Sequence, residues 1–112
     1  MYLFVYGTLK KGFCNSYLLN GQEFIKEAST DNDYKMVDFK GMYPYLFNED
    51  GGFKIKGEIY KVSDNCLDEL DRFEGAPDFY YRDTIVADGI NCECYFINET
   101  YKRGECIDEF VK

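Results

Sequence analysis

The 112 residues of this chain include no histidine, which limits the side chains that could transfer protons. Ser-His-Asp and Cys-His catalysis both need an imidazole and are therefore excluded. An enzyme with this sequence would have to use carboxylates, tyrosines, lysines or cysteines as its acids and bases. The useful question is which of these groups the fold places where its pKa departs from that of a solvated side chain.

Glu74 is the carboxylate whose predicted position is hardest to explain by a purely structural role. The segment 63–75 is predicted to form a helix, and at about 100° per residue Glu74 projects between Leu67 and Leu70 on its apolar stripe. Glu74 also falls in the last turn, where the helix dipole disfavours an anion. Burial and the dipole both raise a carboxylate's pKa, which suits it to general acid and base catalysis near neutral pH. The other interpretation is that the helix frays before Gly75 and Glu74 points into water.

The opening stretch 1–12, MYLFVYGTLKKG, ends an apolar run in a glycine-containing loop. Gly7 and Gly12 have the outer spacing of a phosphate-binding P-loop, but the Lys-Ser/Thr pair that must follow is missing, which excludes that site. A Gly-Thr turn at the end of a strand can instead point backbone N–H groups at a carboxylate or an oxyanion. The alternative is a plain turn. In both cases Lys10 and Lys11 are expected to be mostly solvated.

Cysteines, an arginine and several tyrosines supply weaker candidates. Cys14 and Cys66 could be nucleophiles, but no histidine activates them, so buried and unreactive thiols are expected. Arg82 could pair with a carboxylate or stay in solvent. Four tyrosines could line a pocket or serve only in the core: Tyr43, Tyr45, Tyr80 and Tyr81.

The elements that must position these residues are mostly strands. The predicted helix begins at Ser63 or Asp64 as its cap, ends at Gly75, and should bury an apolar arc. That arc consists of Cys66, Leu67, Leu70 and Phe73. Strands are predicted over 2–6, 34–39, 53–62, 79–89 and 90–98. Gly57 is expected to mark a bulge or a point of close approach, a turn is expected at 88–89, and Pro44 should lie in an edge strand or loop. Residues 13–28 are ambiguous, with a short helix possible before Gly21, and 99–112 carries no assignment. The expected class is α+β, a small curved mixed sheet or barrel with one or two flanking helices.

Length, charge and cysteine content bound the function. A chain of 112 residues should form one domain, 1–112, and 46% hydrophobic residues can build its core. The net charge of −8 makes nucleic-acid binding an unsuitable main role. The five cysteines do not indicate a disulfide framework, and Cys92 and Cys94 are expected to face one side of a strand rather than bind a metal. Neither a membrane span nor a signal peptide is evident, so a cytoplasmic location is expected.

Four segments in the right order resemble the gamma-glutamylcyclotransferase-like (AIG2-like) superfamily. They are FVYGTLKKG, YPYLF, KGEIYKV and LDELDRFEGAPDFYYR, which together span most of residues 2–97. Within this superfamily the stretch LDRFEGAP, followed by Tyr80-x-Arg82, is most similar to the gamma-glutamylaminecyclotransferase branch. No motif matches the tail, 99–112.

The resemblance implies a small barrel with flanking helices and a reaction that releases 5-oxoproline from a gamma-glutamyl amide without a cofactor or metal. It implies that Glu74 is the catalytic acid and base. It further implies that the loop offers backbone N–H groups to the glutamyl part of the substrate and that three other residues line the pocket. The loop residues are Tyr6, Gly7, Thr8 and Leu9, and the pocket residues are Tyr43, Pro44 and Tyr80.

Two alternatives stay open at this point. The leaving group could be an amine, an amino acid, the remainder of glutathione or another small metabolite. The domain could also be a non-catalytic module that binds a small gamma-glutamyl molecule in a retained pocket. The sequence does not indicate an oligomeric state.

Overall fold

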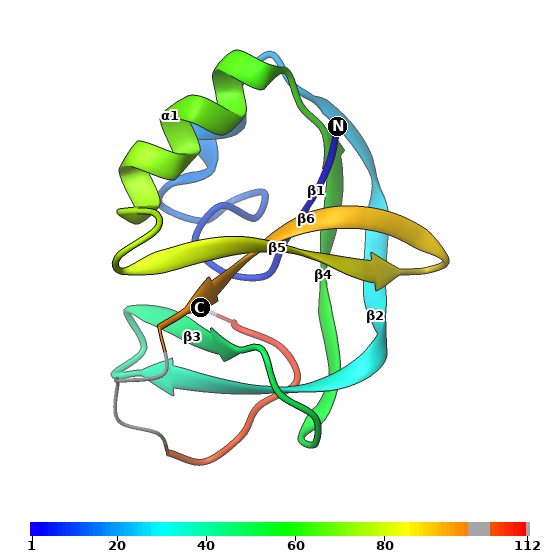
Figure 1. The fold of residues 1–112 in the computed structure, drawn as a ribbon, viewed down its shortest axis with the longest axis vertical. Helices are drawn as coiled ribbons and strands as arrows, with labels where there is room; N and C mark the ends of the chain where they lie inside the picture. Colours follow the sequence, from blue (N-terminus) through cyan, green and yellow to red (C-terminus); the bar gives the residue numbers. More distant parts are fainter. Residues whose placement is uncertain (99–103, 112) are drawn as a thin grey trace.

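One sheet that curves back on itself dominates the computed structural model, which describes residues 1–98 and 104–111 (Figure 1). Its strand order is β3-β2-β4-β1-β6-β5, and β2 also pairs with β5 through Thr30 and Ala87. This extra pairing closes β2, β4, β1, β6 and β5 into a barrel, with β3 added beside β2. The described strands are β1 Tyr2–Val5, β2 Glu23–Phe39, β3 Tyr43–Phe47, β4 Phe53–Lys61, β5 Tyr80–Ala87 and β6 Ile90–Ile97.

The long strand β2 differs most from the prediction, since a strand was expected only over 34–39. It bends through two register shifts against β4, one between Phe24 and Lys26 and one between Ser29 and Asp33. Such irregularities increase local twist and bending. At the second shift the buried Thr30 Oγ1 donates to the Asn32 carbonyl (2.7 Å) and accepts from the Ile55 N–H (2.8 Å). The bend lets one strand serve both the barrel and β3.

The short strand β1 runs between β4, to which it is antiparallel, and β6, to which it is parallel. The predicted close approach at Gly57 is confirmed, since a Cβ atom there would lie 2.3 Å from the Val5 carbonyl oxygen. Glycine therefore lets β4 pass directly against the end of β1. The chain leaves β1 at Val5 and enters the glycine-containing loop at one end of the barrel.

The helix α1 (Asp64–Glu74) matches the prediction closely. The Ser63 hydroxyl oxygen accepts a hydrogen bond from the Cys66 N–H (3.1 Å), and Gly75 ends the helix in the left-handed conformation with φ of 67°. A short 3-10 helix, η1 (Ser16–Leu19), lies against α1. The prediction that Phe73 is buried is wrong, because Phe73 is 45% exposed.

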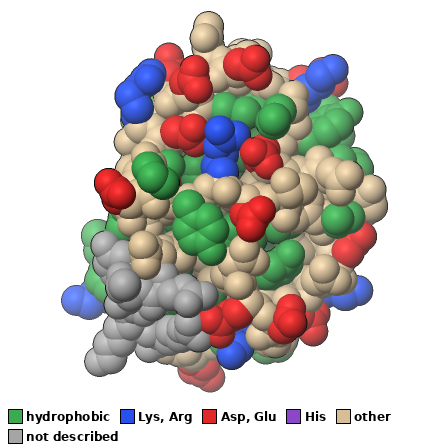
Figure 2. Space-filling view, viewed as in Figure 1, with side chains coloured by type: hydrophobic (Ala, Val, Ile, Leu, Met, Phe, Trp, Pro, Cys, Tyr) green, Lys and Arg blue, Asp and Glu red, His purple; other side chains and the backbone are tan. Residues whose placement is uncertain are grey.

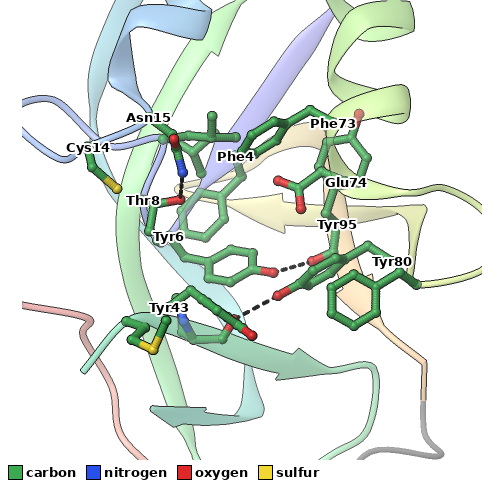
Figure 3. Close-up of a pocket in the computed structure, with 16 residues that line it drawn as sticks. Phe4, Tyr6, Thr8, Cys14, Asn15, Tyr43, Phe73, Glu74, Tyr80 and Tyr95 are labelled. Carbon is green, nitrogen blue, oxygen red and sulfur yellow. Dashed lines mark hydrogen bonds between the residues drawn. The ribbon is translucent and has the colours of Figure 1, made fainter. Parts of the chain in front are cut away.

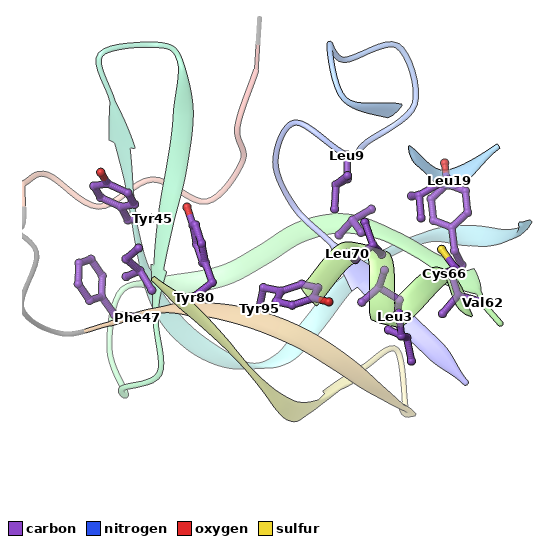
Figure 4. Close-up of a cluster of buried hydrophobic side chains, with 14 of the residues drawn as sticks. Leu3, Leu9, Leu19, Tyr45, Phe47, Val62, Cys66, Leu70, Tyr80 and Tyr95 are labelled. Carbon is purple, nitrogen blue, oxygen red and sulfur yellow. The ribbon is translucent and has the colours of Figure 1, made fainter. Parts of the chain in front are cut away.

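The core has two clusters, one of which lies beneath α1 and continues toward β3 (Figure 4). In Figure 4, Leu3, Cys66 and Leu70 form one end of this cluster, and Tyr45 and Phe47 form the other. The second cluster contains Cys92 and Cys94, whose predicted common orientation in β6 is confirmed by their burial. All five cysteines are free thiols.

The surface carries acidic side chains over the whole face seen in Figure 2, interspersed with hydrophobic side chains and fewer lysines and arginines. The turn between β5 and β6 falls at Asp88-Gly89 as predicted. Within the described ranges, no helix is long and apolar enough to cross a membrane. The sequence predicts no element in the tail 99–112. Residues 99–103 and 112 lie outside the described residues, and 104–111 pack along β2 and β4 through Ile107 and Asp108.

Candidate active site

A cavity of about 410 Å³ opens where the loop after β1, the start of β3, the end of α1 and the start of β5 meet (Figure 3). The eight residues that the family resemblance implied all line it: Tyr6, Gly7, Thr8, Leu9, Tyr43, Pro44, Glu74 and Tyr80. They come from four separate segments, so the fold has brought them together. Their roles in binding or catalysis stay predictions.

Glu74 is the last residue of α1, and its carboxylate points into the cavity (Figure 3). The orientation expected from helix geometry is therefore the one that the structure has. Partial burial raises the pKa of the Glu74 carboxyl from 4.5 to about 7. Among the described residues, the carboxylate has no hydrogen-bond or ion-pair partner, so nothing on the protein offsets this loss of solvation.

The loop after β1 keeps three successive backbone N–H groups available. The next two amides are used: the Lys10 N–H donates to the Gly7 carbonyl (3.1 Å) and the Lys11 N–H to a Glu58 carboxylate oxygen (2.9 Å). The N–H groups of residues 7–9 donate no hydrogen bond to any described residue. These three residues line the cavity, so their amides are suited to an anionic or carbonyl oxygen.

The shape of this loop depends on a close contact and on Asn15. A Cβ atom at Gly7 would lie 2.9 Å from two ring carbons of Pro44, so glycine is needed here for space rather than for an unusual φ angle. Asn15 binds Thr8 twice, with its side-chain amide donating to the Thr8 hydroxyl (2.9 Å) and its N–H donating to the Thr8 carbonyl (3.0 Å). Two walls of the cavity, the loop after β1 and the strand β3, are therefore in direct contact.

Three tyrosines form hydrogen bonds at the floor of the cavity. Tyr6 donates its hydroxyl hydrogen to the Tyr95 carbonyl (2.6 Å), and Tyr80 donates to the Pro44 carbonyl (3.1 Å), as Figure 3 shows. Burial raises the pKa of Tyr6 well above its usual value, and burial together with Asp71 raises that of Tyr95. The Tyr6 and Tyr95 phenols are therefore neutral near pH 7, and Glu74 is the carboxyl group that can exchange a proton within the cavity.

Arg82 connects α1 to the sheet through ion pairs. Its guanidinium contacts both carboxylate oxygens of Asp71, at 2.8 and 3.2 Å, and one oxygen of Glu93, at 3.0 Å. The Tyr95 hydroxyl also donates to Asp71 (2.7 Å). Of the two alternatives for Arg82, pairing with a carboxylate is the one observed. Asp71 precedes Glu74 by almost one turn, so this network sets where the end of the helix lies.

Lys10 contradicts the expectation that both loop lysines are solvated. It is only 6% exposed, and its Nζ donates to the Phe110 carbonyl (2.7 Å). The physical reason is that the described tail folds back over this part of the barrel and covers the side chain. Lys11 is exposed, as expected, and lies over the Phe24 ring.

Several lining residues were missed or misjudged. Cys14 is exposed rather than buried, while Cys66 is buried as expected. Tyr45 and Tyr81 do not line the cavity. The lining residues without a sequence signal lie in plain strand or loop segments, where only tertiary structure shows their orientation. They are Phe4, Val5, Asn15, Met42, Phe79 and Tyr95.

The comparison that decides the family is with a model described as gamma-glutamyl cyclotransferase, AIG2-like, which matches residues 3–109. The chain belongs to this family of enzymes. It is 49% identical over 90 residues to gamma-glutamylaminecyclotransferase A of Danio rerio, covering 74% of this chain and 56% of that protein. It is 45% identical over 91 residues to gamma-glutamylaminecyclotransferase C of the same organism, covering 75% and 60%.

The fold of this AIG2-like chain is also that of a solved relative. The crystal structure of an AIG2-like protein from Mus musculus superposes with a TM-score of 0.82 at 29% identity, covering 90% of this chain and 78% of that one. The predicted class, a small mixed barrel with a flanking helix, is confirmed. The chain spans only 56–60% of the length of the two zebrafish relatives.

Proposed function

We propose that this protein is a gamma-glutamylamine cyclotransferase, which releases 5-oxoproline and a free amine from a gamma-glutamyl amide. The observation that carries the proposal is Glu74, an unpaired carboxyl group with a pKa of about 7 that faces a cavity with three available amides. The two zebrafish relatives are named gamma-glutamylaminecyclotransferases, which favours an amine as the leaving group. The ligand is a small molecule, as a cavity of about 410 Å³ requires.

In the proposed reaction the substrate supplies its own nucleophile. The alpha-amine of the glutamyl group attacks the gamma-carbonyl carbon, a C–N bond forms to close the five-membered ring, and the original amide bond breaks. Because the attack is intramolecular, the protein gains most by holding the glutamyl chain in a folded, near-attack geometry. The buried floor, formed by Tyr6, Tyr80 and Tyr95, has the rigid hydrogen bonds needed to shape that conformation.

Glu74 moves the proton in this proposal. Its carboxylate takes a proton from the alpha-ammonium, which makes the amine nucleophilic, and then gives it to the departing amine nitrogen. The attacking nitrogen loses its second proton as it becomes the ring N–H, and the same carboxylate passes this proton to the released amine, which leaves as an ammonium ion. A pKa near 7 allows both transfers without a large free-energy mismatch. No protein nucleophile is required, which fits a chain without histidine.

The amides of Gly7, Thr8 and Leu9 bind the glutamyl group. They can stabilise the oxyanion that develops on the gamma-carbonyl or hold the alpha-carboxylate, since both need N–H donors in a site shielded from water. The other loop residue, Tyr6, supports the loop through its hydrogen bond to β6. Tyr43 and Pro44 line the same cavity as Glu74.

The experiment measures 5-oxoproline from gamma-glutamyl-epsilon-lysine, glutathione and gamma-glutamyl amino acids. We expect turnover of at least one gamma-glutamyl amine, and loss of turnover in Glu74→Gln with the fold intact by circular dichroism. Glu69→Gln, on the exposed face of the same helix, is the matched control and should keep full activity. A fully active Glu74→Gln, or no product from the whole panel, would contradict the proposal.

Two other functions give different outcomes in the same assay. Faster turnover of glutathione or of gamma-glutamyl amino acids would identify a cyclotransferase with another leaving group. Thermal stabilisation by 5-oxoproline without any turnover would identify a binding module. The single domain over 1–112 and the cytoplasmic location stay predictions, which limited proteolysis and cell fractionation test.

A further inference from the structure

The mouth of the cavity is apolar and partly aromatic. Met42 and Phe73 are 59% and 45% exposed although both line the cavity. Tyr43 and Phe79 also line the cavity and are only partly buried. Large apolar side chains left in solvent around a cavity indicate that a ligand or partner covers them.

The aromatic walls of this mouth are held in place. Tyr43 stacks on Phe39 with ring centroids 5.4 Å apart, and Phe79 packs edge-on against Tyr80 at 5.0 Å. Met42 is a flexible thioether that can adapt to the shape of a bound group and makes favourable contacts with aromatic rings. The mouth thus combines rigid rings with one adjustable side chain.

Cations are absent from the described lining of the cavity, and the lysines on the adjoining loops are used elsewhere. Lys10 donates to the Phe110 carbonyl, and Lys40 lies over the Phe39 ring with its Nζ 5.4 Å from the centroid. The one charged group among these lining residues is Glu74, which the proposed mechanism already uses. A leaving group that carried its own carboxylate would find no described cation at the mouth.

We propose that the leaving amine is an arylalkylamine or alkylamine whose substituent on the amide nitrogen carries no charged group and is covered by Met42, Tyr43, Phe73 and Phe79. The inference rests on the proposed function, because the glutamyl group must occupy the buried floor for its substituent to reach the mouth. The reaction forms the ring C–N bond and breaks the amide C–N bond. Two protons leave the alpha-ammonium as its nitrogen becomes the ring N–H, and both pass through Glu74 to the departing nitrogen, which leaves as an ammonium ion. No oxidant or other co-reactant is needed.

The physical reason is desolvation. A phenyl ring at the mouth would replace water on four apolar side chains and could stack against Tyr43 or Phe79. The ammonium and carboxylate of a lysine leaving group would lose part of their hydration against the same surface without gaining a described charged partner. Discrimination should therefore appear mainly in KM, since these contacts form equally in the ground state and the transition state.

The test compares kcat/KM for three amides that share the glutamyl group: gamma-glutamyl-2-phenylethylamide, gamma-glutamylbutylamide and gamma-glutamyl-epsilon-lysine. We expect the phenylethylamide to exceed the lysine compound by about tenfold or more, with butylamide between them. Equal or faster turnover of the lysine compound would overturn this inference and leave the proposed function standing. Absence of 5-oxoproline from all three would overturn both.

A charge placed at the mouth gives a second, independent readout. Met42→Glu offers an anion to the lysine ammonium, so the ratio of phenylethylamide to lysine turnover should fall by about tenfold. Phe53→Glu is the matched control, since Phe53 is 47% exposed but lies outside the cavity, and its ratio should equal that of the unmodified protein. A ratio unchanged in Met42→Glu would overturn the assignment of the leaving-group site.

Discussion

At the residue scale, Glu74 links the candidate site to the stability of the protein. Burial raises the pKa of its carboxyl from 4.5 to about 7, so between these pH values the folded protein binds more protons than the unfolded chain. The free energy of unfolding must then fall as pH rises through this window, by about 3 kcal/mol at most from this group.

We predict that Glu74→Gln removes this pH dependence. A neutral amide has no such titration, so the variant should gain stability relative to the unmodified protein from pH 4.5 to 7 and keep that gain at pH 8. Urea denaturation at a series of pH values measures it. If the two unfolding curves differ by the same amount at pH 4.5 and pH 8, Glu74 is solvated and the helix end frays.

Gly7 is predicted to be intolerant of a side chain because of Pro44. The Cβ atom of Gly7→Ala would lie 2.9 Å from the proline ring, and such overpacking costs about 1–3 kcal/mol. Pro44→Ala removes the clashing ring atoms, so the double variant should be less destabilised than the sum of the two single variants. Additive free energies of unfolding in this double-mutant cycle would show that the contact does not constrain the loop.

Residue-level predictions from the sequence succeeded where only local geometry was needed. Helix periodicity placed Glu74 on the apolar face, and the structure turns its carboxylate into the cavity. The burial of Lys10 was not predictable in this way, because its partner, the Phe110 carbonyl, is 100 residues away in the chain. Phe73 fitted the apolar arc but lies at the mouth of the cavity, which periodicity alone does not reveal.

At the element scale, the pairing of Arg82 with Asp71 determines how the end of α1 meets the sheet. Arg82→Met should lower kcat by about tenfold to a hundredfold through misplacement of Glu74, with less effect on KM. It should also shift the pH midpoint of activity downward, because a displaced Glu74 is better solvated. Arg82→Lys should restore part of the activity, since it keeps the charge without the paired geometry.

Arg72→Met is the control for that prediction. Arg72 lies on the exposed face of the same helix and should leave both kcat and the pH midpoint unchanged. A purely structural role for Arg82 would lower the free energy of unfolding without moving the midpoint, and that result would contradict a positioning role.

Elements with local signals were the predictable ones. The ends of α1 were marked by Ser63 and Gly75, and both caps are present. The strand β2 was recognised only over its last six residues, because the polar run at 29–33 hides a strand whose pairing with β4 and β5 is long-range. Tyr95, which β6 contributes to the floor of the cavity, was missed for the same reason.

At the scale of the whole molecule, Lys10 joins the loop after β1 to the tail. Lys10→Met would leave the Phe110 carbonyl without its charged donor, at a cost of about 1–3 kcal/mol in the free energy of unfolding. Lys11→Met, at the exposed neighbouring position, should change it by only about 0.5 kcal/mol. Urea denaturation compares the two, and equal losses would show that the Lys10 contact contributes no specific stability.

The central claim is that one carboxyl group, Glu74, carries the proton in the release of 5-oxoproline. The most direct measurement is the pH dependence of kcat/KM from pH 5 to 8.5 with a gamma-glutamyl amide that the protein turns over. We predict a rise through a midpoint near 7, since the ionised form of Glu74 must accept the ammonium proton, and no measurable activity in Glu74→Gln. A flat profile, or the same midpoint in an active Glu74→Gln, would contradict it.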